Sequence, residues 1–393
     1  MRKLFFRTLL YSVLLLAACG AAHAQDENRV ALYPDEQERL RTAPLPEIEA
    51  ELAAMGQDIL NHPVGPYKDY VNGRFILMLS EVLKRADSYA YPFAGIKTVS
   101  RIYPEDECFR LFTWVLVDQD SLQQVQNYYH FGLVQRPIQQ AGAVTYAVVV
   151  LNDRVDRTPT IENEILNPTK WLGALYYHPK NSDYGVLTYQ GKYAQKDGMS
   201  GKMRQKKVRY YVVLGYNGHN RQNNYKIIDC ITFPDAEDPL KIEFGAPIFY
   251  FSEVPKSRCV FKYSDNTHFS LNLGQVRDPR SKRLSEMLIF DHLQSNYLAS
   301  EDTNSLAVQQ ERRYGPAGDY DALAWIKRVH NNRKGFFYLL KEVDVYHPQM
   351  EQLDPDETRK QAERDRQQLI EQRALPAPKP APKKKKIKDK PGR

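Results

Sequence analysis

Short apolar runs separated by turn residues fill the middle of the chain. Two of them, residues 208–214 and 225–233, flank a polar loop at residues 217–224. β-Branched and aromatic residues dominate the runs, whereas Gly, Pro, Asn and Asp lie between them, which is typical of consecutive strands. The pattern predicts a hairpin, followed by strands at residues 242–251, 259–263, 268–273 and 286–292.

The same pattern extends to both sides of this stretch. Residues 109–117 are apolar on both faces, which predicts a central strand. Polar loops are predicted at residues 191–207 and in the turn-rich segment 314–322. Further strands are predicted at residues 127–134, 144–151, 171–177, 184–189 and 336–343.

No long helix separates these strands, so the pairing should be antiparallel. Ten or more strands exceed what one open twisted sheet usually holds. The alternatives are two packed sheets, a closed barrel or propeller-like blades, although no fixed-period repeat supports the last.

Helical periodicity is confined to the two ends of the chain. Residues 35–62 predict mostly exposed helices, divided at Pro44 and Pro46, and residues 67–86 predict a better helix. The core-facing stripe of that helix consists of Tyr70, Phe75, Leu79, Val82 and Leu83.

The predicted fold class is therefore α+β, mainly β. Helices at residues 25–105 precede a large antiparallel β-meander, sandwich or barrel-like, at residues 106–348. A solvated polar helix at 349–375 and a disordered, Pro- and Lys-rich basic tail at 376–393 complete the chain.

Residues 1–24 have the pattern of a signal peptide. A basic start precedes an apolar run at residues 9–18 that is too short to span a membrane. A small-x-small cleavage site at residues 22–24 favours soluble export to the periplasm or the extracellular space. The alternative is a lipobox at residues 16–19, which would make Cys19 the lipidated start of an outer-membrane lipoprotein. No transmembrane helix is predicted in the mature chain.

The net charge of +7 is concentrated at the ends. Residues 1–24 contribute +3 and residues 379–393 contribute +7, so the intervening residues carry −3. This distribution argues against nucleic acid as a partner. A mobile lysine cluster is suited to anionic envelope components, namely lipid, lipopolysaccharide or cell-wall polymer. The predicted surface-binding residues are Lys383, Lys384, Lys385, Lys386, Lys388 and Lys390.

Three cysteines remain after cleavage at residue 24, and they allow at most one disulfide. Cys230 and Cys259 lie in neighbouring predicted strands and are the candidate pair, with buried free thiols as the alternative. The spacing of Cys and His predicts no metal site, and no cofactor is predicted. The oligomeric state stays open.

Candidate catalytic residues are few. Asp291 and His292 are adjacent and should point to opposite faces of a strand unless a bulge intervenes. Asp229 lies mid-strand, where an ion pair with an arginine is the favoured interpretation. His219 lies in the polar loop 217–224, where turn formation is favoured over binding.

These residues leave two functions open. The first is an exported, non-catalytic envelope protein, and catalysis is the less favoured alternative because no known catalytic motif is present. The second is a periplasmic or secreted hydrolase or carbohydrate-active protein with a cleft lined by some of the 26 tyrosines.

Four short segments carry a resemblance to a group of proteins. Residues 214–218 (LGYNG), 226–229 (KIID), 244–249 (FGAPIF) and 290–293 (FDHL) resemble uncharacterised exported proteins of the Bacteroidota. The resemblance covers about residues 108–345. It implies export and a β-rich fold, and it implies no activity.

Overall fold

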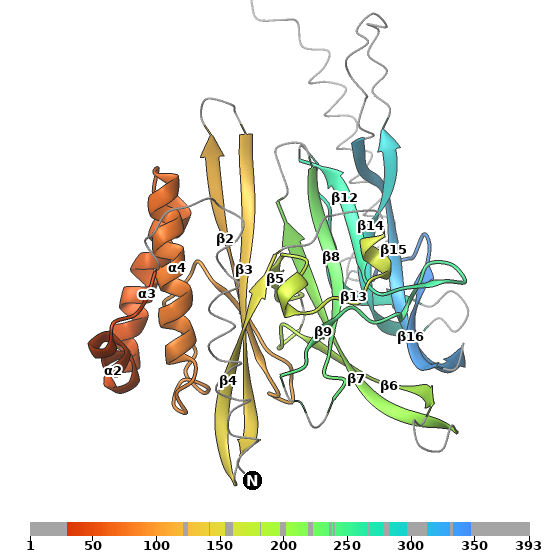
Figure 1. Cartoon of the computed structure of the whole chain (residues 1–393). Coiled ribbons are helices and arrows are strands. Elements are labelled where there is room, and N and C mark those ends of the chain that lie inside the picture. Colours follow the sequence, from red (N-terminus) through yellow and green to blue (C-terminus); the bar gives the residue numbers. More distant parts are fainter. Residues whose placement is uncertain are drawn as a thin grey trace, which may run out of the picture. The chain divides into compact units, whose positions relative to one another are not determined.

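In a computed structural model, the chain forms two compact units, Met1–Asp344 and Val345–Arg393 (Figure 1). The predicted signal peptide, C-terminal helix and basic tail lie outside the described residues, and every element below belongs to the first unit. The described residues are 30–120, 125–140, 142–153, 160–180, 182–196, 202–218, 223–235, 238, 240–265, 267–277, 283–296, 313–330 and 333–346.

Three helices precede the strands: α2 (Pro34–Thr42), α3 (Leu45–Asn61) and α4 (Gly65–Val82). Each has a proline in its first turn, where the missing N–H costs no hydrogen bond. The expectation that the first helices are mostly exposed is wrong for α3, whose Ile48, Leu52 and Ile59 form a buried stripe. The predicted stripe of α4 is also partly wrong, because Tyr70 is 48% exposed.

The first sheet, called sheet I, has four antiparallel strands in chain order. The predicted central strand is confirmed, because β2 pairs with both β1 and β3. The strands are β1 (Ser100–Ile102), β2 (Arg110–Asp120), β3 (Val125–Gln140) and β4 (Ala143–Asn152).

The second sheet, called sheet II, has twelve strands. Its main path runs β12-β8-β7-β6-β16-β15-β14-β13, with β5, β9, β10 and β11 attached to it. The strands are β5 (Leu175–Tyr177), β6 (Leu187–Lys196), β7 (Met203–Asn217), β8 (Asn223–Thr232), β9 (Glu243–Phe244), β10 (Phe249–Tyr250), β11 (Pro255–Lys256), β12 (Cys259–Ser264), β13 (Leu271–Arg277), β14 (Leu284–Asn296), β15 (Arg313–His330) and β16 (Arg333–Leu340).

The described strands therefore form two antiparallel sheets, as in the first of the three predicted alternatives. Antiparallel pairing holds throughout except between β10 and β16, which are parallel. The barrel-like alternative is wrong, because the end strands β12 and β13 of sheet II do not pair with each other among the described strands.

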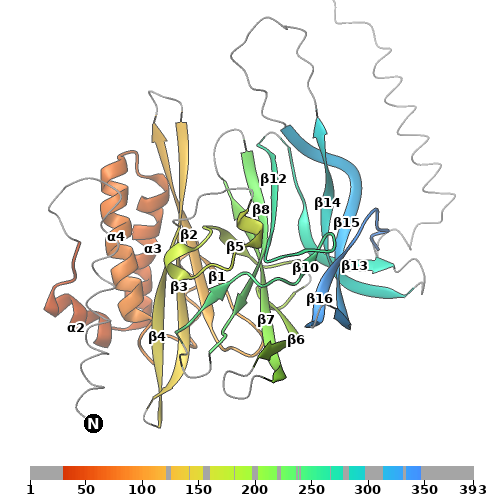
Figure 2. The ribbon, with the colours of Figure 1, turned by 45° about the vertical axis from the view of Figure 1, so that its right-hand side comes forward.

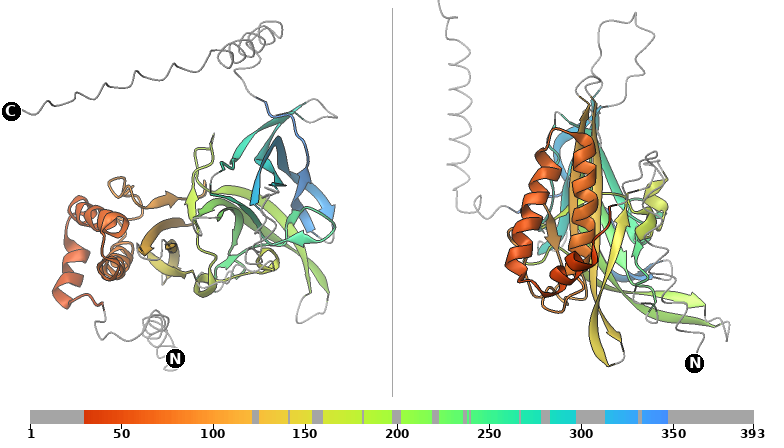
Figure 3. Two further views of the ribbon diagram at one scale, coloured as in Figure 1. Left: turned by 90° about the horizontal axis from the view of Figure 1, so that it is seen from above. Right: turned by 60° about the vertical axis from the view of Figure 1, so that its left-hand side comes forward.

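Three hydrophobic cores hold these layers together. The helix core lies between the helices and sheet I, and the intersheet core contains residues of both sheets (Figures 2 and 3). The inner core lies on the other face of sheet II, where the sheet curls until β12 contacts β15. Representative members are Leu52, Phe75, Phe112 and Trp114 of the helix core, Leu111, Trp171, Val213 and Ile227 of the intersheet core, and Val212, Ile228, Phe290 and Leu323 of the inner core.

Two predicted loops are instead parts of strands. Residues 191–196 belong to β6 and residues 203–207 to β7, and Lys192 pairs with Lys207. Residues 204–207 are exposed and polar. They therefore lack the alternation of apolar and polar residues that indicates a strand. The turn-rich segment 314–322 belongs to β15, which accommodates Gly318 at a φ of +103°.

Candidate functional site

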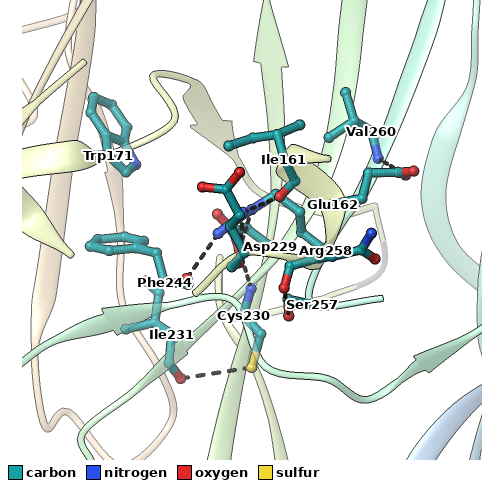
Figure 4. Close-up of polar contacts among 12 residues, drawn as sticks. Ile161, Glu162, Trp171, Asp229, Cys230, Ile231, Phe244, Ser257, Arg258 and Val260 are labelled. Atoms are coloured by element: carbon teal, nitrogen blue, oxygen red, sulfur yellow. Dashed lines mark hydrogen bonds and ion pairs between the residues drawn. The ribbon is translucent and has the colours of Figure 1, made fainter. Parts of the chain in front are cut away.

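Asp229 and Arg258 form a fully buried ion pair between β8 and the residues that lead into β12. Asp229 lies on β8 between Ile227 and Ile231, and strand alternation turns all three toward the intersheet core. Arg258 lies directly before β12, and its Nε is 3.3 Å from Asp229 Oδ1 (Figure 4). The expectation of an arginine partner for Asp229 is confirmed.

The guanidinium of Arg258 also donates to three backbone carbonyls in two other segments of the chain. Its Nη1 donates to the carbonyl oxygens of Ile161 (2.7 Å) and Glu164 (3.0 Å), and its Nη2 donates to that of Phe244 (2.8 Å). The first two carbonyls flank a short 3₁₀ helix, Ile161–Asn163. A planar group with several fixed donors is suited to this arrangement, because a lysine could not reach all three carbonyls.

Glu162 strengthens the same junction from the 3₁₀ helix (Figure 4). Its Oε1 accepts the backbone N–H of Val260 at 3.0 Å, and its backbone oxygen accepts that of Arg258 at 3.1 Å. The residues around Arg258 therefore fasten β12 to the chain that enters sheet II.

The electrostatics of the pair indicate a structural role. Asp229 Oδ1 accepts the N–H of Cys230 at 2.8 Å, and Oδ2 has no hydrogen-bond partner among the described residues. Burial raises the pKa of Asp229, because desolvation of the carboxylate outweighs the attraction of Arg258. Both side chains are 0% exposed, so a substrate cannot reach the carboxylate from solvent in this conformation.

His292 forms a second pair, with a carboxylate that the sequence did not identify. His292 Nδ1 lies 2.8 Å from Asp321 Oδ2, and Asp321 Oδ1 accepts the N–H of Glu342 at 3.1 Å. Asp321 lies opposite Phe290 and two residues from Leu323, so it lies on the face of sheet II that carries the inner core. The contact with Asp321 places the imidazole of His292 on the same face.

A bulge lies at this position. The register of β14 and β15 shifts between Asp291 and Leu293, and Leu293 packs on the inner core as Phe290 does. The shift does not bring Asp291 and His292 to one partner, because Asp291 Oδ2 accepts the N–H of Ser270 at 2.5 Å. Burial raises the pKa of Asp291.

The predicted catalytic residues therefore do not form one constellation. Asp229 faces the intersheet core, whereas His292 lies on the opposite face of sheet II, and His219 lies outside the described residues. The arrangement that resembles acid–base chemistry is the pair of His292 and Asp321, because an orienting carboxylate fixes the imidazole of a general base. The side chain of His292 is 37% exposed.

A polar cluster between the two sheets was missed by sequence reasoning. His130 Nδ1 of β3 lies 3.3 Å from Asn217 Nδ2 of β7 and 3.5 Å from Asp153 Oδ2. Asn217 Nδ2 also donates to the carbonyl of Gly173, whose own N–H donates to Asp153 Oδ1 at 3.2 Å. A Cβ at Gly173 would lie 2.1 Å from Asp153 Oδ2, so the cluster requires glycine there.

The described ends of the predicted loop 217–224 are strand residues, because Asn217 ends β7 and Asn223 and Asn224 begin β8. Asn217 is 0% exposed, and Asn223 and Asn224 are also buried. Asn224 accepts the hydroxyl of Tyr216 and donates to Asp265 Oδ1 at 2.7 Å. No local pattern distinguishes these asparagines from turn residues, because their partners are distant in the sequence.

Cys230 and Cys259 are free thiols buried in the inner core. Cys259 pairs directly with Ile228, so Cys230 is its diagonal neighbour across β8 and β12. Diagonal Cα atoms are ~7–8 Å apart, beyond the usual reach of a disulfide. Burial raises the pKa of both thiols well above their ordinary value.

Several of the tyrosines that suggested a lined cleft pack in the cores instead. The rings of Tyr189 and Tyr210 lie 4.8 and 6.1 Å from that of Trp325, all within or against the inner core. A shallow cavity of ≈ 290 Å³ has no tyrosine in its lining, which includes Leu60, His62, Lys68, Val117 and Asp118. Among the described residues, no group of three or more His, Cys, Asp or Glu is placed to hold a metal ion.

Comparison with protein-family models, with curated proteins and with solved structures finds no match for this chain. The resemblance to exported proteins of the Bacteroidota therefore stays a prediction. Over the described residues, no helix combines the length and apolar character needed to cross a membrane.

Proposed function

We propose that the chain is an exported, non-catalytic protein of the cell envelope. In this proposal, the β-rich body is a scaffold, and the basic tail associates with anionic lipid, lipopolysaccharide or cell-wall polymer. The observation that supports a scaffold is the enclosure of Asp229. This candidate catalytic carboxylate is fully buried against Arg258, which is itself bonded to three backbone carbonyls.

The tail supplies the attraction. Each lysine near an anionic membrane surface contributes about 1 kcal/mol, so six lysines on a proline-rich spacer suffice for reversible binding. The attraction weakens as salt rises, because the Debye length falls to ~3 Å at 1 M salt. The predicted residues are Lys383, Lys384, Lys385, Lys386, Lys388 and Lys390.

Vesicle sedimentation tests this function. Full-length mature protein should sediment with vesicles that contain phosphatidylglycerol, remain in solution with pure phosphatidylcholine, and be released by salt. Replacing the six lysines by glutamine should abolish sedimentation, whereas replacing them by arginine should preserve it. Sedimentation that persists in the glutamine variant would exclude the tail as the binding element.

The pair of His292 and Asp321 favours a second candidate, a hydrolase or carbohydrate-active protein. A panel of p-nitrophenyl esters and glycosides is a suitable probe. Any turnover by this site should be lost in His292→Gln and reduced in Asp321→Asn, because the carboxylate orients the imidazole. Turnover that survives His292→Gln would contradict this role.

A further inference from the structure

Among the described strands, β4 pairs with β3 alone, and the 3₁₀ helix Pro168–Lys170 contacts it. The strand ends sheet I and pairs with β3 alone from Ala143 to Leu151, within the part of the chain that the structure describes. Beyond that run, the N–H of Trp171 donates to the carbonyl of Asn152 and covers the end of the strand. The outer edge of β4 thus presents a row of backbone donors and acceptors.

The other described strands at the sheet ends carry protection that β4 lacks. The strand β1 has three residues, one of them Arg101, and β12 carries Lys262 and contacts β15. The strand β13 carries Arg277, whose N–H donates to the carbonyl of Asp344. Short length, charge and coverage are the devices by which proteins prevent pairing at sheet edges.

The run from Ala143 to Leu151 has none of these devices. It contains no charged residue and no proline, and four of its residues are valines. Residues 143–145 are exposed, and Val144 has 46% of its surface accessible. Such an edge in a folded protein indicates a partner that supplies a strand.

We propose that this partner is β4 of a second copy of the chain, paired antiparallel about a two-fold axis. In an antiparallel pair, the backbone N–H and C=O groups of two facing residues point either both toward the interface or both away from it. These directions alternate along a strand, so the facing residues of the two copies must both have even numbers or both have odd numbers. Centring the uncharged run puts Ala147 opposite itself, Tyr146 opposite Val148 and Val144 opposite Val150. The two four-stranded sheets become one eight-stranded sheet.

Charge and packing both favour a second copy. When a strand pairs with its own copy about a two-fold axis, each charged residue lies near the same charge of the other copy. The run from Ala143 to Leu151 has no charged residue, so it avoids this repulsion. Val148 and Val150 pack against the helix core, and Val149 packs against the intersheet core. In the proposed register, Val150 of one copy faces Val144 of the other on the side of the helix core, and Val149 faces Thr145 on the side of the intersheet core.

A cysteine at the axis tests the register. Facing Cα atoms in an antiparallel pair are ~4.5–5.5 Å apart, which is within disulfide reach. Mature Ala147→Cys protein should therefore form a covalent dimer under mild oxidation, detected on a non-reducing gel. The matched control is Gln139→Cys, an exposed position on the internal strand β3, which should stay uncrosslinked.

Charge substitution tests the interface in solution. Light scattering should show a dimer for the wild type, and Ala147→Glu should raise its dissociation constant at least tenfold. An equal mixture of Ala147→Glu and Ala147→Lys should restore the dimer, with circular dichroism confirming that each variant is folded. A monomeric wild type, a monomer that instead binds an added extended peptide, or a dimer unaffected by Ala147→Glu overturns the proposal.

Discussion

Removing the guanidinium at position 258 tests the structural role of the buried ion pair. Arg258→Met keeps an unbranched side chain of similar length but leaves Asp229 buried without its partner. Truncating one partner of a buried pair costs about 3–5 kcal/mol. The carbonyls of Ile161, Glu164 and Phe244 also lose a donor. Those of Ile161 and Phe244 keep the N–H groups of Glu164 and Leu166, so the further cost of about 1–3 kcal/mol for an unsatisfied buried group applies to the carbonyl of Glu164.

These contributions overlap, so the expected loss is at least about 3 kcal/mol, a large part of a typical ~5–15 kcal/mol of stability. Equilibrium urea denaturation followed by tryptophan fluorescence is a suitable assay, because Trp114 and Trp171 are buried. The midpoint should fall while the slope with denaturant stays constant.

Two further variants separate the contributions. Arg258→Lys retains the charge but not the three carbonyl bonds, so it should be destabilised nearly as much as Arg258→Met. Arg258→Met combined with Asp229→Asn should lose less stability than the sum of the single changes, because no charge is left buried alone. A loss below about 1 kcal/mol in Arg258→Met would refute the structural role.

Three other measurements test separate features. Burial raises the pKa of the Asp229 carboxyl in the folded protein. The contribution of Asp229 to stability therefore increases as pH falls and is lost as pH rises through the folded-state pKa. In Asp229→Asn, that part of the pH dependence of unfolding should be absent. A thiol reagent at mildly alkaline pH should react slowly with folded mature protein and fast after unfolding in urea. The reason is that burial raises the pKa of Cys108 to about 12 and encloses the thiols of Cys230 and Cys259. A thiol that reacts fast in the folded state would contradict this. Gly173→Ala should lower the free energy of unfolding by about 1–3 kcal/mol, because its Cβ would overlap Asp153, and an unchanged urea midpoint would show that the cluster tolerates a side chain.

Local pattern predicted the parts of the fold that depend on alternation. The apolar run at 109–117 was predicted to be central, and β2 indeed has Leu111 in the intersheet core and Phe112 in the helix core. The arms of the β6–β7 hairpin were missed because they are exposed and rich in lysine, so they lack a buried face. The alternation of apolar and polar residues thus identifies a strand only where one face of the strand packs against a hydrophobic core.

For each contact of the candidate site, the sequence identified only one of the two residues. The mid-strand position of Asp229 indicated an inward carboxylate with an arginine partner, but nothing in the spacing selected Arg258, which lies between the short strands β11 and β12. Asp321 was hidden in a segment that resembles a turn, and it reaches His292 only through the pairing of β14 with β15. Such partners are set by sheet order, which the sequence leaves open.

The place of β16 in sheet II has a consequence for folding kinetics. The last of the described strands, β16, lies between β6 and β15, and its pairing joins Arg333 to Tyr193. A growing chain that ends before residue 333 has both halves of sheet II but not the strand that unites them. Closing so long a loop is slow, so we expect the sheet to be completed late, after the whole unit has been synthesised.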